Sequence, residues 1–427
     1  MAQLIKQYPG QRLGNDKGLV LVVSLMMVAV ILLLGTTAVL TTSTDMKISA
    51  NYKTGNEAFY AAEAGLEEAR SRLRADAAPA ILITDGFPAN TGWRAYIGPL
   101  TKAQGKGFDS GNGMHQRVVS IYNPTPPLDY TVRIVHATNA AGNLLYWGDV
   151  APVDGKPERN TAGVGTNIYR VTSYGLASNA AKTLEVEIAP LPPITTPGAL
   201  YVQSPLNIIG NARVLGVDQC GGANLPGVTT TLDQSTVSIS NNALVTGAGS
   251  TSGTPPSVLD HGPVLDVPAM IDNWKNSANY AYNMVSATQT GMTWGDPAEG
   301  ATLQNPSTCS EKNVVYYNTR NASGTETDLK LTNSSGCGIL MVDGDLEVNG
   351  GFSWYGVVLV TGMVKYTGGG GKNVTGGVIS GDSMINETDE STTGGGTNIV
   401  YCSAAINNLT SGRPLRRLSW MEKTNNQ

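Results

Sequence analysis

The longest uninterrupted apolar segment of the chain lies near its N-terminus, from Leu19 to Leu40. It runs for 22 residues without a charged side chain. At 1.5 Å per residue, a helix of this length measures about 33 Å, enough to cross the hydrocarbon core of a bilayer. The preceding residues 1–18 carry three basic side chains and one acidic side chain. Because basic residues stay on the cytoplasmic side, we expect residues 1–18 in the cytoplasm and the rest of the chain outside.

A helical pattern continues beyond the apolar segment until Pro79. Apolar side chains recur there at intervals of three and four residues and form one stripe: Phe59, Ala62, Leu66, Ala69 and Leu73. The two segments together predict a single rod, residues 19–78, of roughly 85 Å, with Gly55 as a soft point. A cleaved signal peptide and a plain membrane anchor are the alternative interpretations. The apolar segment is longer than that of a signal peptide, which favours a retained helix.

The segment NYKTGNEAFYAAEAGLEEAR, residues 51–70, carries a family resemblance. Together with a short basic leader and an apolar helix that begins at once, it resembles the N-terminus of PilX-like type IV pilus minor pilins. The resemblance implies cleavage by prepilin peptidase between Gly18 and Leu19. It also implies that the apolar helix packs with other pilins in the core of the pilus. Such a helix leaves lipid only for another apolar environment.

One position departs from the pattern of the wider pilin family. Most pilins carry a glutamate at the fifth mature residue, which meets the N-terminal amine of a neighbouring subunit, whereas this chain has Val23. PilX-like pilins and the tip pseudopilin K of type II secretion are similar in lacking it. The resemblance therefore implies a tip or initiating position in a filament. A minor pseudopilin of type II secretion is the nearest alternative.

Residues 79–197 alternate between loops and strand-like runs. The period-two pattern is clearest in residues 129–137 and 181–190. The run at 167–177 and the run at 181–190 predict a hairpin. We expect an antiparallel sheet packed against the second half of the long helix, as in pilins. The Pro-rich stretch 191–197 ends this region.

Glycines spaced six residues apart characterise the next region, residues 198–410. Six of them follow one another at regular six-residue intervals: Gly338, Gly344, Gly350, Gly356, Gly362 and Gly368. The second and fourth residues after each of the first five glycines are all apolar or aromatic. Each unit predicts a short strand with one buried face and a glycine corner. Repeated strands of this kind predict a β-solenoid-like domain, and a meander or sandwich is the alternative.

The same phase occurs at Gly198–Gly216 and at Val237–Val245. Polar stretches and a helical pattern interrupt the repeat at about residues 250–335. We interpret this segment as an insertion that projects from the stack, a common place for a binding surface. Residues 411–427 follow as a C-terminal tail. The predicted fold class is α+β, with a long N-terminal helix, an antiparallel pilin-like sheet and a Gly-rich, β-helix-like C-terminal half.

The composition narrows the functional classes. Charged residues make up 14% of the chain, Gly supplies 51 positions and the net charge is −5. The low charge content argues against disorder, and the acidic balance offers no basic surface for phosphates, so we expect no nucleic-acid partner. Only three histidines occur, and none lies near a cysteine in sequence. This argues against a zinc site and against Ser-His or Cys-His catalysis, and we expect no cofactor.

Four cysteines lie on the exported side, at Cys220, Cys309, Cys337 and Cys402. An even number in an exported chain favours two disulfides. Three pairings are possible. We favour Cys309–Cys337 at the start of the main repeat, with Cys220–Cys402 joining its ends. Free buried cysteines are the alternative.

Two acidic groups, within residues 343–347 and 387–390, are candidates for a Ca²⁺ site because Ca²⁺ prefers oxygen ligands. Neither shows an EF-hand or nonapeptide pattern, so ordinary surface acids are the simpler interpretation. Parallel β-helices also host polysaccharide-cleaving enzymes. No constellation in the sequence singles out such a site.

We therefore predict a non-enzymatic minor pilin of a type IV pilus. It is expected in the inner membrane as a single-pass protein with a cytoplasmic N-terminus, and then in the extracellular filament. Expected partners are prepilin peptidase, other pilins through residues 19–40, and a PilY-type tip adhesin. The C-terminal half would serve adhesion or pilus assembly. A membrane-anchored β-helix enzyme that acts on polysaccharide is the alternative from a different class.

Overall fold

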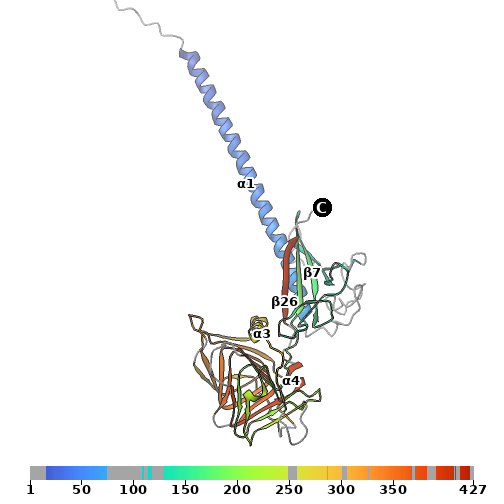
Figure 1. Cartoon of the computed structure of the whole chain (residues 1–427). Helices are drawn as coiled ribbons and strands as arrows, with labels where there is room; N and C mark the ends of the chain where they lie inside the picture. Colours follow the sequence, from blue (N-terminus) through green and yellow to red (C-terminus); the bar gives the residue numbers. More distant parts are fainter. Residues whose placement is uncertain are drawn as a thin grey trace, which may run out of the picture.

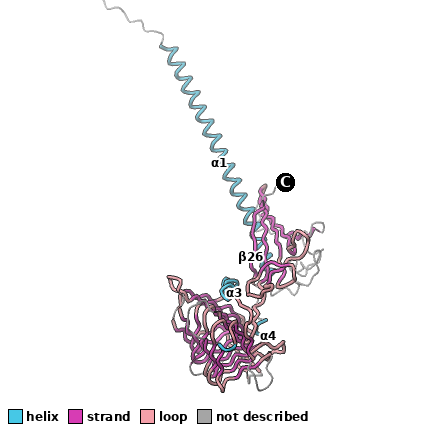
Figure 2. Tube along the Cα trace, viewed as in Figure 1, coloured by secondary structure: helices cyan, strands magenta, loops and turns pink. Residues whose placement is uncertain are grey.

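The main elements of the described part of the chain are one long helix and two groups of strands (Figures 1 and 2). The computed structural model describes residues 16–74, 108–109, 114–117, 128–248, 257–285, 287–300, 305–325, 327–367, 371–381, 391–407, 409 and 414–423. Helix α1, Asp16–Arg74, has 59 residues and a length of about 88 Å. It is continuous through Gly55, and only its C-terminal end reaches the strands.

A six-stranded antiparallel sheet packs against the C-terminal end of α1, in the order β1-β2-β3-β7-β8-β26. The strands are Phe108–Asp109, Met114–Arg117, Leu128–His136, Tyr169–Ala177, Ala180–Pro190 and Leu415–Lys423. The predicted hairpin is present as β7 and β8, which pair along the whole of β7. A small three-stranded sheet, β5-β4-β6, comprises Glu158–Asn160, Tyr146–Gly148 and Thr166–Asn167.

The apolar stripe predicted for the second half of α1 is buried on this sheet. Ala62, Leu66, Ala69 and Leu73 are at most 5% exposed, and they join one core with side chains of β3, β7 and β8. Phe59 packs against the edge of the same core. The alternating strand pattern supplies the other half of that core, because every second residue of β7 is buried.

The C-terminal strand β26 completes one edge of this sheet by pairing antiparallel with β8. The segment expected as a C-terminal tail, residues 411–427, thus returns to the first sheet over Leu415–Lys423. Its period-two pattern is broken by a register shift between Arg417 and Ser419, which explains why the strand is inconspicuous in the sequence. The whole C-terminal domain is therefore inserted between β8 and β26.

A large curled sheet of 17 strands, paired in parallel, forms that domain. Strands β9 to β15 are Leu200–Val202, Leu206–Ile208, Arg213–Leu215, Val228–Thr230, Val237–Ile239, Leu244–Thr246 and Val258–Leu259. Strands β16 to β20 are Tyr280–Asn283, Thr288–Thr290, Thr293–Trp294, Asn313–Asn318 and Asp328–Asp343. Strands β21 to β25 are Asp345–Val360, Val364–Thr367, Gly371–Ser380, Ser391–Thr393 and Gly396–Tyr401.

The hexad pattern predicts the interior of this sheet correctly. The ten apolar side chains of its five units are at most 2% exposed and belong to one central core. Gly338 pairs with Gly356, and Leu346 pairs with Val364. Both offsets are 18 residues, so one coil there consists of three hexads. The hexads are not separate strands, however, since β20 and β21 each continue for 16 residues through their glycine corners.

The chain enters this stack of coils in the middle. Strands β9, β10 and β11 pair on one side with β12, β13 and β14, and on the other side with β23, β24 and β25. The chain winds outward to β15, crosses to the opposite end at β16, and winds back to β25. The segment expected as an insertion, about residues 250–335, differs from that expectation because β15 to β19 are members of the same sheet. Bulky aromatic residues, among them Trp294 and Tyr317, fill its interior there in place of the hexad pattern.

Two short helices, α3 (Val267–Trp274) and α4 (Ser403–Asn407), cover one outer face of the curled sheet. The side chain of Asp266 caps α3 by accepting a backbone N–H of its first turn at 2.8 Å. The apolar face of α3 packs on β20 and β21 in a second apolar cluster. This layer explains why outward residues such as Ile339 and Val357 are apolar and fully buried. Two 3₁₀ turns, Gln234–Thr236 and Lys275–Ser277, also belong to this domain.

Candidate functional site

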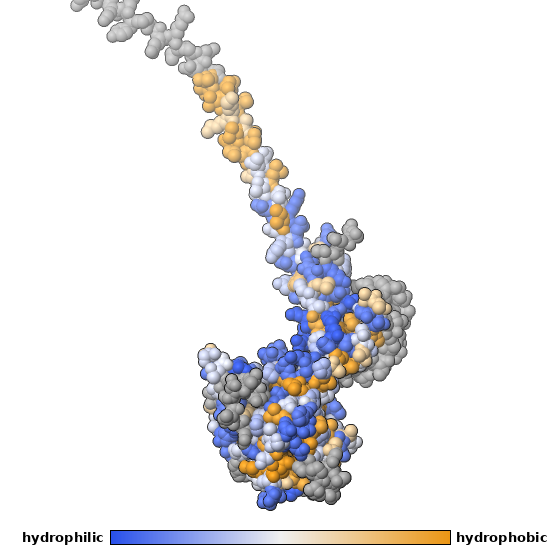
Figure 3. All heavy atoms as spheres, in the orientation of Figure 1, coloured by the Kyte–Doolittle hydropathy of each residue, from blue (hydrophilic) through white to orange (hydrophobic). Residues whose placement is uncertain are grey.

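The first half of α1 leaves its apolar side chains uncovered. Leu19, Val23 and Leu40 are 67%, 56% and 67% exposed, and every residue between Leu19 and Leu40 is exposed in the chain. Figure 3 shows this part of the helix as a predominantly apolar surface, in contrast to the mixed surface of the remaining protein. Removing apolar surface from water is favourable by about 25 cal/mol per Å². The segment is long and apolar enough to cross a membrane, and its surface fits a bilayer or a bundle of other apolar helices.

The few polar side chains of this segment are satisfied within the helix. The hydroxyl groups of Ser24 and Thr36 donate to carbonyl oxygens three residues earlier, at 2.9 and 3.0 Å. The hydroxyl of Thr37 donates to the carbonyl oxygen of Leu33 at 3.0 Å. A hydroxyl bonded in this way leaves no unpaired donor in an apolar environment. The segment is therefore suited to hydrocarbon along its whole length.

The expected processing site lies at the start of α1. Gly18 and Leu19 are its third and fourth residues, and residues 1–15 of the expected leader lie outside the described part of the chain. Val23 follows one turn later, and no carboxylate occurs between Leu19 and Leu40.

An ion-pair network lies on the face of the six-stranded sheet opposite α1. Glu187 contacts Arg170 at 2.9 Å and Arg159 at 2.6 Å, and Glu185 contacts Lys423 of β26 at 2.5 Å. Burial alone would raise the pKa of Glu187, but the two guanidinium groups outweigh it and hold the pKa below its ordinary value of 4.5. The network thus links the returning strand β26 to the centre of the sheet.

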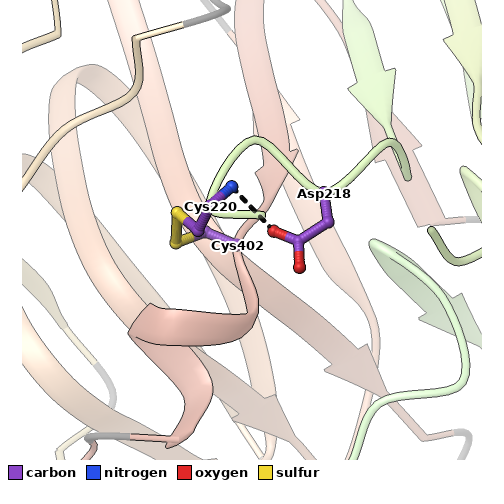
Figure 4. A group of neighbouring side chains, drawn as sticks. All are labelled: Asp218, Cys220 and Cys402. Atoms are coloured by element: carbon purple, nitrogen blue, oxygen red, sulfur yellow. Dashed lines mark hydrogen bonds between the residues drawn. A yellow bond between two sulfur atoms is a disulfide. The ribbon is translucent and has the colours of Figure 1, made fainter. Parts of the chain in front are cut away.

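Both disulfides favoured from the sequence are formed, with Cα–Cα distances of 5.1 Å for Cys220–Cys402 and 6.4 Å for Cys309–Cys337. The first joins the turn after β11, in the middle of the stack, to the start of α4. Asp218 supports this junction, because its carboxylate accepts the backbone N–H of Cys220 at 2.8 Å (Figure 4). The same carboxylate also accepts the backbone N–H of Ser403 at 3.2 Å.

Asp218, Cys220 and Cys402 are also the one group of His, Cys, Asp and Glu side chains that is compact enough to hold a metal ion, among the residues that the structure describes. Both sulfur atoms are consumed by the disulfide, so the group offers a single carboxylate. Burial would raise the pKa of Asp218, but hydrogen bonds from Ser403 and from backbone N–H groups outweigh it and lower the pKa. The carboxylate thus acts as a charged cap for α4.

The first acidic group proposed for Ca²⁺ is engaged in contacts between coils. Asp343 pairs with Arg320 at 3.1 Å, and Glu347 pairs with Lys330 at 2.7 Å. Asp345 accepts a backbone N–H of the next coil at 2.8 Å. These side chains are ordinary structural acids. The second group, residues 387–390, lies outside the described residues.

A helix whose first half is apolar and uncovered, and whose second half is docked on an antiparallel sheet, defines a class. It is the arrangement that the sequence leads us to expect of a pilin-like protein. Residues 17–67 match the family model described as PilX N-terminal, which covers both the uncovered and the docked part of α1. The N-terminal region of the chain is therefore similar to that of PilX-like proteins, and the match extends over both parts of α1.

Among solved structures, the chain is similar to the competence-associated pilin ComZ from Thermus thermophilus. The two share 14% sequence identity, and the alignment covers 87% of this chain and 97% of that one with a TM-score of 0.22. A TM-score of 0.22 is too low to indicate a shared fold, so the fold of this chain is described from its own strand pairing alone. No curated protein matches the chain.

Proposed function

We propose that this protein is a minor pilin that enters a type IV pilus at its tip or in its initiating complex. The observation that carries the proposal is the uncovered apolar half of α1, 22 residues without a charge, rigidly continued by the half that docks on the sheet. A helix with this surface fits a bilayer, and a bundle of similar helices offers it another apolar environment. The change from membrane to filament therefore requires no refolding of the exported domains.

Val23 supports a position at one end of the filament. A buried charge is costly unless it is paired, and a pilin with a glutamate at this position can neutralise the N-terminal amine of a neighbour. Val23 offers no such partner. A subunit without this carboxylate fits best where no neighbouring amine needs one, namely at the tip or at the start of assembly.

The basic leader gives the proposed orientation before assembly. Residues 1–18 stay in the cytoplasm, the apolar helix crosses the inner membrane once, and prepilin peptidase cleaves between Gly18 and Leu19. Both disulfides then lie on the oxidising side of the membrane.

The C-terminal domain is the part available for adhesion or for a partner such as a PilY-type tip adhesin. It is reached through two connections from the same sheet, after β8 and before β26. Such a pair of connections holds the domain away from the apolar part of α1, as Figure 1 shows. A surface at the end of the filament is thereby left accessible.

The test is N-terminal sequencing of the protein recovered from sheared pili. We expect the mature protein to begin at Leu19. Gly18→Val and Leu19→Glu should leave the full-length band unshifted on a gel, because the peptidase no longer finds a small residue before an apolar one. Gly14→Val, the same substitution elsewhere in the leader, serves as the matched control and should be processed normally.

Equal mobility of the wild-type protein in strains with and without prepilin peptidase would contradict the proposal. Recovery with a secreted exoprotein system instead of with pili would favour a type II secretion pseudopilin.

A further inference from the structure

A cavity of about 270 Å³ lies on the outer surface of the curled sheet. It is bounded by the outward faces of β23 and β25 and by the segments on either side of residues 301–304. The lining groups that matter below are Glu299, Ser307, Asn373, Asn398 and Val400. None of these groups takes part in the helix, the ion-pair network or the disulfides described above.

A ladder of polar side chains crosses the cavity from coil to coil. The Ser353 hydroxyl donates to one carboxylate oxygen of Glu299 at 2.5 Å, and the Asn373 amide donates to the other at 3.1 Å. The Asn398 amide donates to the Asn373 carbonyl oxygen at 2.8 Å. Strand register places Ser353, Asn373 and Asn398 side by side on β21, β23 and β25.

The hydrogen bonds of the ladder orient its side chains but use only some of their donors and acceptors. Each Asn side chain has two donor hydrogens and two acceptor lone pairs, and a carboxylate can accept about four hydrogen bonds. Each of these groups uses only part of that capacity within the ladder. Strands β23 and β25 hold Asn373 and Asn398 in place, so a ligand does not have to order these two side chains on binding.

The chemistry of the lining selects the ligand class. None of its described lining residues is Lys or Arg, so an anion is not favoured. Amides and a carboxylate complement hydroxyl groups, which both donate and accept, while Val400 and Pro306 offer apolar contact to C–H groups. The volume is below the range of about 300–1,000 Å³ for cavities that hold drug-sized ligands. It suits a single ring.

We propose that this cavity binds one residue of a neutral carbohydrate. The inference deepens the proposed function, since it names a ligand class for the exposed domain, and its role in adhesion rests on that proposal. Binding itself does not depend on filament assembly.

The experiment is saturation-transfer NMR on the full chain in a detergent without a sugar head group. The probes are the methyl glycosides of glucose, galactose, mannose and N-acetylglucosamine. At least one should receive saturation from the wild-type protein. Asn373→Leu should weaken its binding by about tenfold or more, which corresponds to about 1.4 kcal/mol. Glu299→Ala should do the same, and Glu299 is exposed, so this second variant does not endanger folding.

Asn349→Leu is the matched control, because Asn349 lies on β21 outside the cavity, and it should bind like the wild type. The proposal is overturned if no probe binds, if binding survives in both variants, or if CaCl₂ or ammonium chloride binds there in place of sugars. The amount of each variant in sheared pili should equal that of the wild type. Loss of sugar binding with normal incorporation separates this site from the pilin role, whereas absence of the wild type from pili counts against the pilin role alone.

Discussion

Helix α1 contains two glycines that offer a matched test of its docking on the sheet. At Gly65 a Cβ would lie 2.3 Å from the Ser173 hydroxyl oxygen and 2.8 Å from a methyl carbon of Val132. At Gly55, ten residues earlier on the same helix, no atom lies within 4 Å of the added carbon. The same substitution, Gly→Ala, should therefore have opposite effects at the two positions.

The magnitude follows from two terms. Replacing Gly by Ala in a helix interior stabilises it by about 1 kcal/mol, and Gly55→Ala should show this gain alone. Gly65→Ala gains the same amount, but overpacking costs about 1–3 kcal/mol. Ser173 and Val132 are at most 1% exposed, so neither can turn into solvent to make room. We expect the two variants to differ by about 2 kcal/mol in the stability of the docked helix.

Hydrogen–deuterium exchange of peptides within residues 58–73 reports this difference, because the amides exchange when the helix leaves the sheet and its own hydrogen bonds then open. The docked segment should exchange about 30-fold faster in Gly65→Ala than in Gly55→Ala, with a lower unfolding temperature. Exchange in Gly65→Ala that is as slow as in Gly55→Ala would show that the helix does not approach the sheet this closely.

Two further predictions concern the disulfides and pH. Cys220 and Cys402 close a loop with a sequence separation of 182, and the loss of chain entropy predicts that replacing both by Ala destabilises the fold by about 5 kcal/mol. The same calculation gives about 3.6 kcal/mol for Cys309 and Cys337, whose separation is 28. Thermal melts should show the larger loss for the first pair, and equal losses would contradict the loop-length argument. Because the folded pKa of Glu187 is below its ordinary value of 4.5, its contribution to stability is complete above that value and is lost as the pH falls through the folded pKa. Unfolding midpoints of Glu187→Gln should therefore depend less on pH below 4.5 than those of the wild type, and identical acid profiles would refute this.

The parts of the fold that depend on local spacing can be predicted from the sequence. The stripe that includes Leu66 and Leu73 lies on the sheet because residues seven apart share one helix face. The hexads bury Leu340, Trp354 and their counterparts because side chains alternate between the two faces of a strand. Neither result requires knowledge of which strand is the neighbour.

The parts that depend on distant partners could not be predicted. Leu206 pairs with Ser391, and Arg213 pairs with Asn398, so the central coil is completed by residues from the far end of the chain. No local pattern specifies that stacking, since every coil offers a similar parallel edge. The pairing of β26 with β8 could not be predicted either, because β8 already has a hairpin partner in β7 and its other edge gives no sequence signal.

The candidate sites divide in the same way. The cysteine pairing followed from the position of each cysteine relative to the repeat, and the apolar helix followed from composition. The cavity beside Glu299 gave no signal, because Asn373 and Asn398 are 25 residues apart in a region where neighbouring coils differ by 18 and 20 residues. Only the three-dimensional register aligns them.

The insertion of the C-terminal domain between β8 and β26 determines how the molecule responds to mechanical load. The two connections leave the sheet at adjacent positions, since Pro190 pairs with Leu415. Tension on the outer domain is consequently shared by two neighbouring strands, and each is pulled along its own length. To separate the outer domain, β8 and β26 must slide together along β7 and away from α1, instead of detaching one strand at a time. The shared attachment therefore resists force.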